Sequence, residues 1–222
     1  MLFWRNSTVY EASLFLATIF GSPRDVSAVV PRLVPDLYLS CSSPHQNIIH
    51  AILVSSVHHL QAAYPSQIPF QQYLDTIPHH LFPKESEGRK WLSSLAVSLR
   101  TCQYALLERG TRRPAILQIL GQDSKLEDSL GLSAVLVAVD SLRAKARDTA
   151  WTVMRSAYRE LVCHADSINT RKWLERSLCL QSTVSETFMV SLDQFLEQQR
   201  LHGAVRAKEG VEGRWIVSKI RS

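Results

Sequence analysis

The stretch "RDTAWTVMRSAYREL" (residues 147–161) carries two patterns at once. Its apolar residues recur every three or four positions, which is the spacing of a helix that packs on one side. Along another side, a cation or a tryptophan occupies every fourth position: Arg143, Arg147, Trp151, Arg155 and Arg159. A helix turns once in about 3.6 residues, so steps of four trace a slanting ridge around it. The stretch therefore predicts a long packed helix with a second, cationic side, which we call the arginine ridge.

The helical pattern extends from Ser133 to about Cys163. Its apolar residues predict a core-facing stripe: Val135, Val139, Leu142, Ala146, Ala150, Val153, Ala157 and Leu161. The arginine ridge admits two interpretations. In the first, the arginines are solvated and Trp151 packs beneath a neighbouring element, because exposed charge is the usual state of a helix surface. In the second, the guanidinium groups bind phosphate or carboxylate and the indole offers a stacking surface.

The charge of the chain is concentrated toward its C-terminus. Of 222 residues, 45% are apolar and 20% are charged, an ordinary globular balance that can bury a core without disulfides. Residues 143–222 hold 14 Lys or Arg and 9 Asp or Glu, whereas residues 1–142 hold 11 of each kind. The net charge of +5 therefore belongs to the C-terminal part, which favours an acidic partner such as nucleic acid or a negatively charged protein.

The cysteines and the apolar runs indicate a soluble protein. Cys41, Cys102, Cys163 and Cys179 are far apart and lack the paired spacing of a disulfide framework or a zinc site. We expect them to be reduced, buried thiols in an intracellular protein. The longest apolar run, Leu130 to Val139, is too short to cross a bilayer, and no signal-peptide pattern is evident. Neither secretion nor a membrane location is expected.

Residues 1–142 contain a series of helical patterns separated by Pro and Gly. They cover residues 8–20, 25–39, 45–65, 68–78, 91–110 and 111–120, and none of them is typical of a strand. Pro31 and Pro35 predict a kinked or divided second helix. Successive helices of this length favour a helical-repeat array resembling tetratricopeptide repeats, although no strict period is present.

Residues 143–222 change in character after the long helix. A helix is expected from Thr170, with Trp173 turned inward, and another from the capping-box pair Thr183 and Glu186 to about Gln199. The last segment, "HGAVRAKEGVEGRWIVSKIRS", is rich in glycine and predicts a β-hairpin, with Trp215, Val217 and Lys219 on one side of its second strand. Short helices followed by a hairpin predict a winged helix.

Signatures of catalysis are missing from the sequence. It contains no GxxxxGK[ST], GxGxxG, GxSxG or HExxH motif. The doublets His58–His59 and His79–His80 lack the spacing of metal ligands, because neighbouring helical residues point about 100° apart. We therefore expect no cofactor, no metal and no enzymatic activity, with an enzyme whose site is assembled from distant residues as the less favoured alternative.

The order "LRAKARDTAWTVMRSAYREL", "NTRKWLERSLCL", "FLEQQRLHG" and "GRWIVSK" resembles the end of the GANP family of PCI-type domains. The basic and aromatic family pattern matches at Arg147, Ala150, Ala157, Tyr158 and Arg159, and the following hydrophobic pattern at Trp173, Leu174, Leu178 and Leu180. Upstream, "KWLSSLAVSLRTCQYALLERG" is similar to the preceding helix pair of the family. The resemblance spans about residues 90–222.

The resemblance implies a mainly α fold, in which a helical-repeat array (residues 1–142) precedes a long helix and a winged-helix subdomain (residues 143–222). It implies a non-enzymatic scaffold of a nuclear messenger-RNA export or transcription-coupled complex, with the cytoplasm also open as a location. The implied partners are another PCI-type subunit, a small acidic disordered protein, and RNA or DNA. The alternative is a purely structural subunit of a lid-like or signalosome-like complex that does not bind nucleic acid.

We expect Trp173 and Trp215 to lie in the core of the winged helix. The basic residues of the long helix and of the hairpin are the expected contacts to nucleic-acid phosphates: Arg143, Arg147, Arg155, Arg159, Arg206, Lys208, Arg214 and Lys219.

Overall fold

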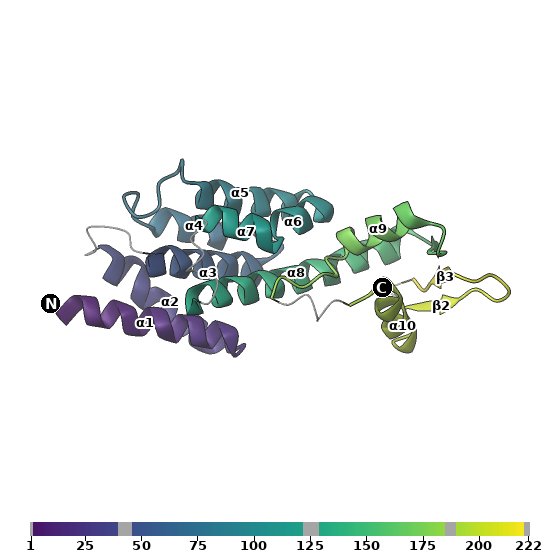
Figure 1. The fold of residues 1–222 in the computed structure, drawn as a ribbon, viewed down its shortest axis with the longest axis horizontal. Coiled ribbons are helices and arrows are strands. Elements are labelled where there is room, and N and C mark those ends of the chain that lie inside the picture. The colour runs from purple at the N-terminus through teal and green to yellow at the C-terminus, as the bar shows by residue number, and fades with distance from the viewer. Residues whose placement is uncertain (1, 40–45, 122–128, 185–189, 220–222) are drawn as a thin grey trace.

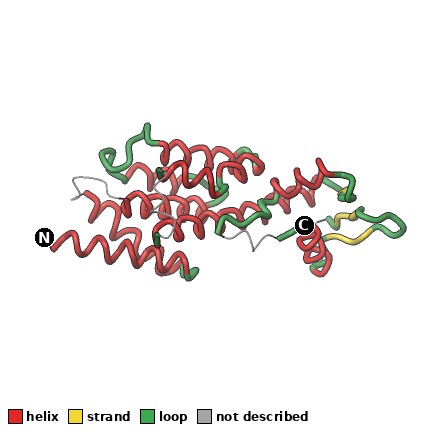
Figure 2. The backbone as a smooth tube through the Cα atoms, viewed as in Figure 1, coloured by secondary structure: helices red, strands yellow, loops and turns green. Residues whose placement is uncertain are grey.

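The computed structural model describes residues 2–39, 46–121, 129–184 and 190–219, and within them the chain is mainly helical with a small antiparallel sheet (Figures 1 and 2). The first helices are α1 (Leu2–Ile19), α2 (Pro23–Pro31), the irregular turn η1 (Arg32–Leu37), α3 (Gln46–Ala63) and α4 (Ile68–Thr76). They are followed by α5 (Glu87–Arg100), α6 (Tyr104–Gly110), α7 (Arg113–Leu120) and α8 (Leu130–Ala157). The C-terminal elements are β1 (Glu160–Val162), α9 (Ile168–Ser177), α10 (Leu192–Leu201), β2 (Val205–Ala207) and β3 (Arg214–Val217).

Local chemistry accounts for where these helices begin and end. Ser86 and Ser129 cap α5 and α8, since each hydroxyl accepts a hydrogen bond from the backbone N–H three residues later. The predicted division of the second helix is confirmed, because Val34, just before Pro35, has a non-helical backbone (φ −125°, ψ 124°). The pattern over 91–110 is two helices, because the chain breaks at Cys102, whose φ is +55°.

The long helix α8 is the centre of the molecule. Its first half packs against α1 and α3, and α3 packs in turn against α4 and α5. The residues that line this core are almost fully buried: Leu132, Val135, Val139 and Leu142 on α8, and Ile52, Val57 and Leu60 on α3. Each such side chain contributes about 1.5–3 kcal/mol relative to exposure. α8 crosses the expected boundary at residue 142 without interruption and leads to the sheet at the other end of the molecule (Figure 1).

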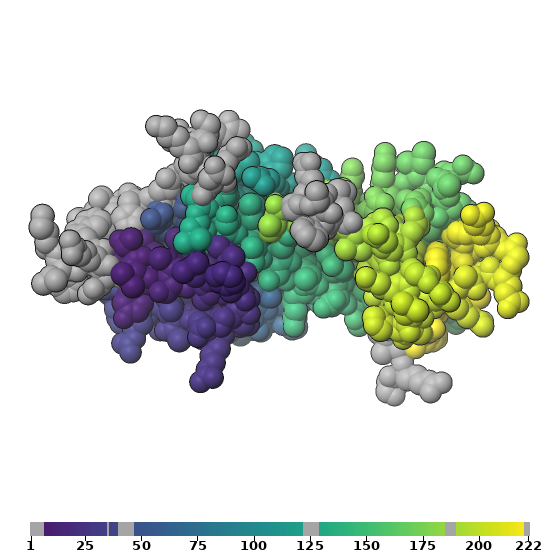
Figure 3. All heavy atoms as spheres, turned by 60° about the horizontal axis from the view of Figure 1, so that its bottom comes forward, coloured from purple at the N-terminus to yellow at the C-terminus, as the bar shows by residue number. Residues whose placement is uncertain are grey.

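The sheet joins the end of α8 to the C-terminal hairpin. Its order is β1–β3–β2 with antiparallel pairing throughout, so Leu161 lies opposite Trp215 and Glu160 lies opposite Ile216. The expectation that the helix continues to Cys163 is wrong. Tyr158 already has an extended backbone (φ −107°, ψ 143°), and β1 follows because its residues pair with β3. The predicted hairpin is confirmed as β2 and β3, which lie with α10 at one end of the molecule (Figure 3).

The last helix begins later than its sequence pattern predicts. Ser191 and Gln194 form the capping box of α10, whereas Thr183 lies outside any helix. The Thr183 hydroxyl donates to the backbone oxygen of Leu136 or to the carboxylate of Asp140, and so fastens this segment to α8. Glu186 lies outside the described residues.

Three sequence predictions about individual features can be compared directly with the described residues. No described helix is both long and apolar enough to span a membrane. Cys163 and Cys179 are buried free thiols, but the prediction of burial is wrong for Cys102, which is exposed; Cys41 lies outside the described ranges. Trp215 packs partly buried against the core, whereas Trp173 is 42% exposed and does not belong to it.

Candidate nucleic-acid interface

Arg143, the first residue of the arginine ridge, is inside the protein and only 1% exposed. Its guanidinium donates to the Thr111 hydroxyl at 2.8 Å and to the backbone oxygen of Gln181 at 2.7 Å. The buried carboxylate of Glu108 lies 3.7 Å from the same group and is also held by Arg112 at 2.9 Å. The expected role of Arg143 in phosphate binding is therefore wrong, because its two terminal nitrogens donate within the fold and the whole side chain is buried where no phosphate can reach it.

Arg147 and Arg155 are also turned toward the chain. Arg147 donates to the backbone oxygens of Leu178 and Cys179, both at 2.9 Å, and burial lowers its pKa. Arg155 donates twice to the backbone oxygen of Ser218, at 3.1 and 3.2 Å. Both side chains are held against the C-terminal segments, so they do not form the outward-facing cationic surface that the sequence pattern predicts.

The arginine ridge thus attaches the C-terminal segments to α8. Trp151, between the arginines, is 6% exposed and packs edge-on against Phe195 of α10, with ring centroids 5.3 Å apart. The guanidinium groups satisfy main-chain oxygens at the end of α9 and after β3, which would otherwise lose hydrogen bonds on burial. Of the first interpretation, the packing of Trp151 beneath a neighbouring element is confirmed, but the expectation of solvated arginines is wrong for Arg143, Arg147 and Arg155 and holds only for Arg159.

The remaining predicted cations are on the surface near the sheet. Arg159, Arg206 and Lys219 are exposed, and Lys208 and Arg214 are half-buried. The register places Arg206 opposite Ile216, and Arg214 lies on the same face of β3 as Ile216. The opposite face carries Leu161, Trp215 and Val217 toward the core. The outer face of the sheet, which we call the wing face, therefore presents Arg206 and Arg214, and Lys208 extends it into the turn.

Acidic residues limit the charge of the wing face. Glu160 on β1 accepts a hydrogen bond from Lys208 at 3.2 Å and lies 3.6 Å from Arg214. Glu209 and Glu212 are exposed in the turn between β2 and β3. Arg159, Arg206 and Lys219 are consequently the predicted residues whose charged groups are most available to a phosphate.

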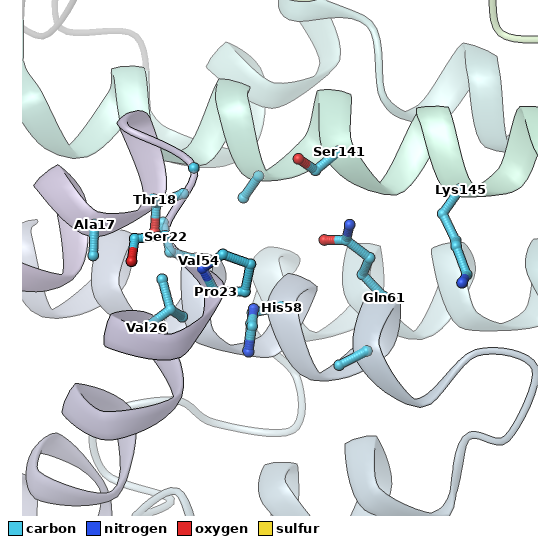
Figure 4. Close-up of a pocket in the computed structure, with 13 residues that line it drawn as sticks. Ala17, Thr18, Ser22, Pro23, Val26, Val54, His58, Gln61, Ser141 and Lys145 are labelled. Carbon is cyan, nitrogen blue, oxygen red and sulfur yellow. The ribbon is translucent and has the colours of Figure 1, made fainter.

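A pocket of about 250 Å³ with a mixed, mainly apolar lining lies far from the sheet, between the α1–α2 turn, α3 and α8 (Figure 4). Its polar side chains are those of Thr18, Ser22, His58, Gln61, Ser141 and Lys145. Burial lowers the pKa of His58, so its imidazole is neutral near pH 7, and Nε2 lies 3.3 Å from the Ser27 hydroxyl. Although the lining includes serines and a histidine, the hydrogen-bond contact of the His58 ring is to Ser27 and not to a serine of the lining, and the described residues contain no cluster suited to a metal.

The sequence interpretation missed an apolar groove between α6, α8 and α9. It has a volume of about 410 Å³, and its lining includes Leu106, Val153, Tyr158 and Trp173. The sequence patterns had assigned Val153 and Trp173 to the core, because periodicity alone does not reveal which part of a wide apolar stripe stays uncovered. The available signal was the width of the apolar stripe on the long helix, which is greater than packing against one neighbouring element requires.

Comparison of the chain with models of protein families, with curated proteins and with solved structures finds no match in any of the three.

Proposed function

We propose that this chain is a non-enzymatic scaffold of the PCI type, in which a tetratricopeptide-like helical array carries a C-terminal winged helix. The supporting observation is the order of elements from α8 onward: helix, strand, two helices and a two-stranded hairpin, with sheet order β1–β3–β2. In a winged helix, a compact set of helices is followed by a hairpin whose turn forms the wing. The helical layers around α3 and α8 support the array assignment.

The scaffold would act in a nuclear messenger-RNA export or transcription-coupled complex, as the family resemblance of residues 90–222 implies. Another PCI-type subunit and a small acidic disordered protein are its proposed protein partners. Since the arginine ridge is used internally, RNA or DNA would bind at the wing face and at the exposed cations beside it, Arg159 and Lys219. Phosphate contacts by a few cations would give weak, strongly salt-dependent binding.

The nucleic-acid part of the proposal is tested with the purified chain and a fluorescent single-stranded RNA of about 20 nucleotides, titrated at about 50 to 200 mM KCl. We expect affinity to fall steeply with salt. Combined Arg206→Glu and Lys219→Glu should weaken binding and reduce the salt slope by about 1 to 2. The matched control is Arg24→Glu with Lys84→Glu, which reverses two exposed charges outside the sheet. Equal losses in both double variants, or no salt dependence, would contradict binding at the wing face.

The second candidate, a structural subunit without nucleic-acid contact, is favoured by the pairing of Glu160 with Lys208 and Arg214. It predicts a stoichiometric protein complex that survives nuclease treatment and high salt during affinity purification. A complex that falls apart on nuclease treatment would exclude this candidate and retain the first.

A further inference from the structure

The groove between α6, α8 and α9, which we call the aromatic groove, has the size and lining of a binding site. Its volume of about 410 Å³ lies within the range of about 300–1,000 Å³ that is usual for ligand pockets. Three elements form it: the α5–α6 turn with α6, the second half of α8, and α9. Its walls are mostly aliphatic and aromatic: Ala105, Leu106, Ala150, Val153, Met154, Ala157, Tyr158 and Trp173.

Large apolar side chains of this groove remain exposed although they are next to the core. Leu106 is 53% exposed, and Val153, Tyr158 and Trp173 are each between 42% and 45% exposed. The rings of Tyr158 and Trp173 meet edge-on with centroids 6.1 Å apart. Four such residues around one groove differ from the single exposed hydrophobics that are normal on a surface. Tyr and Trp are also the residue types that most often dominate binding energy at protein interfaces.

The exposed charges on the helices that form the groove are mainly positive. Arg109 on α6 and Lys172 and Arg176 on α9 are exposed, and the two α9 cations also line a separate, smaller pocket with Glu108 and Glu175. The acids of these two helices are Glu108, which is buried and held by arginines, and Glu175, which is half-buried. On α8, the exposed Asp148 lies five residues before Val153, about 140° away around the helix. Arg100 adds an exposed cation just before the α5–α6 turn that lines the groove.

We propose that the aromatic groove binds a short amphipathic segment of a partner protein, in which one or two bulky apolar residues are flanked by Asp or Glu. The apolar residues would occupy the groove, and the acidic residues would lie near the cations of α6 and α9. A second copy of this chain that docked through the α1 region would fit less well, because the exposed apolar side chains of Val9 and Leu16 on α1 and of Phe20 just after it have no exposed acid beside them on that helix. Nucleic acid fits less well because no Lys or Arg lines the groove itself, whereas nucleic-acid affinity depends on phosphate contacts.

This inference deepens the proposed scaffold function by naming the chemistry of a partner, and it does not depend on the wing face. The probe is a phage-displayed library of random peptides about 16 residues long, selected on the 222-residue chain and counter-selected on its Leu106→Asp variant. We expect the surviving peptides to combine large apolar residues with Asp and Glu. Peptides without acidic enrichment would overturn the charge argument, and failure to obtain any groove-dependent peptide would overturn the proposal.

The affinity of one selected peptide, labelled with fluorescein, is then measured for three variants. Leu106→Asp and Trp173→Ala should each weaken binding about tenfold or more. Leu201→Asp is the matched control, because Leu201 is 75% exposed on α10 outside the groove, and it should bind as the wild type does. Thermal melts confirm that the variants are folded; since both groove residues are at least 42% exposed, little stability should be lost.

Two further measurements test the alternative occupants of the aromatic groove, which are a second copy of this chain and nucleic acid. If sedimentation showed that the wild-type chain is a dimer and that the Leu106→Asp variant is not, the proposal would be overturned in favour of a second copy of this chain. RNA affinity that falls in both groove variants while peptide affinity does not would overturn it in favour of nucleic acid. The Arg206→Glu and Lys219→Glu variant should keep full peptide affinity, so failure of the wing-face proposal leaves the groove proposal standing, and the reverse also holds.

Discussion

Replacing Arg143 by methionine tests directly whether the arginine ridge is structural. The Arg143 guanidinium connects three parts of the chain: α8, the end of α6 at Glu108 and Thr111, and the segment after α9 at Gln181. Methionine has similar length and fills the space, but it cannot donate a hydrogen bond. The Gln181 carbonyl would lose its donor, and the buried Glu108 carboxylate would lose one of its two cations.

The expected loss follows from these contacts. Removing one partner of a buried ion pair costs about 3–5 kcal/mol when the other charge is left uncompensated. Glu108 keeps Arg112 at 2.9 Å, so we expect the lower end, about 3 kcal/mol. For a chain of this length each kcal/mol lowers Tm by about 2–4 °C, which gives a decrease of about 6–12 °C.

Urea unfolding followed by circular dichroism, together with thermal melts, measures this loss. The control is Arg206→Met, because Arg206 is exposed and its replacement should change stability by less than about 0.5 kcal/mol. RNA binding should show the opposite order, with Arg206→Met weaker and folded Arg143→Met unchanged. If Arg143→Met were as stable as the control, the assignment of the ridge as an internal attachment would be refuted.

Three further predictions concern buried groups. Burial lowers the pKa of His50 from 6.5 to about 4, so as the pH falls below about 6.5 this histidine takes up a proton in the unfolded state before it does so in the folded state. The free energy of unfolding should therefore drop by about 3 kcal/mol toward pH 4. In urea titrations, His50→Leu should show a smaller drop than the wild type. Gly131→Ala should destabilise the protein by about 1–3 kcal/mol in the same assay, because a Cβ would lie 2.8 Å from the imidazole of His50, and the loss should shrink in a His50→Ala background. In a Cys41→Ser background, Cys102 alone should react with a thiol reagent before unfolding, since the other described thiols are buried; rapid reaction of two thiols in the native state would contradict this.

The sequence predicted the helical class well but could not reveal the role of the arginine ridge. Periodicity places Arg147 on a side of α8 away from the core stripe, yet its partners are backbone oxygens at Leu178 and Cys179, about 30 residues away. Main-chain oxygens occur at every residue, so no residue type in the sequence marks them as acceptors. Charge pattern alone therefore could not distinguish a solvated arginine from one that holds a neighbouring segment.

The end of α8 was mispredicted for a related reason. Leu161 continues the helical spacing of Ala150 and Ala157, so the pattern extends past the true helix end. What decides the conformation of residues 160–162 is pairing with β3, more than 50 residues later. The hairpin itself was predictable, because its glycines and the alternation of Trp215, Ile216 and Val217 are local signals. The hairpin, which local signals specify, was found, while the strand that depends on distant pairing was not.

The cations of residues 143–222 therefore fall into groups that differ in what their side chains contact. Arg143, Arg147 and Arg155 donate to main-chain oxygens, and Arg171 binds the Cys163 carbonyl and the Asp193 carboxylate, which joins α9 to α10. These four positive charges still contribute to the field of the protein, but their donors are not available to a partner. Apart from Lys145, which lines the pocket beside α3, and Arg200, which pairs with Glu197, the exposed cations described in this part of the chain form two sets, one around the sheet and one on α9 beside the aromatic groove. Because the first set surrounds a polar strand face and the second an apolar groove, substitutions in one should leave binding at the other unchanged, and net charge alone could not have predicted that separation.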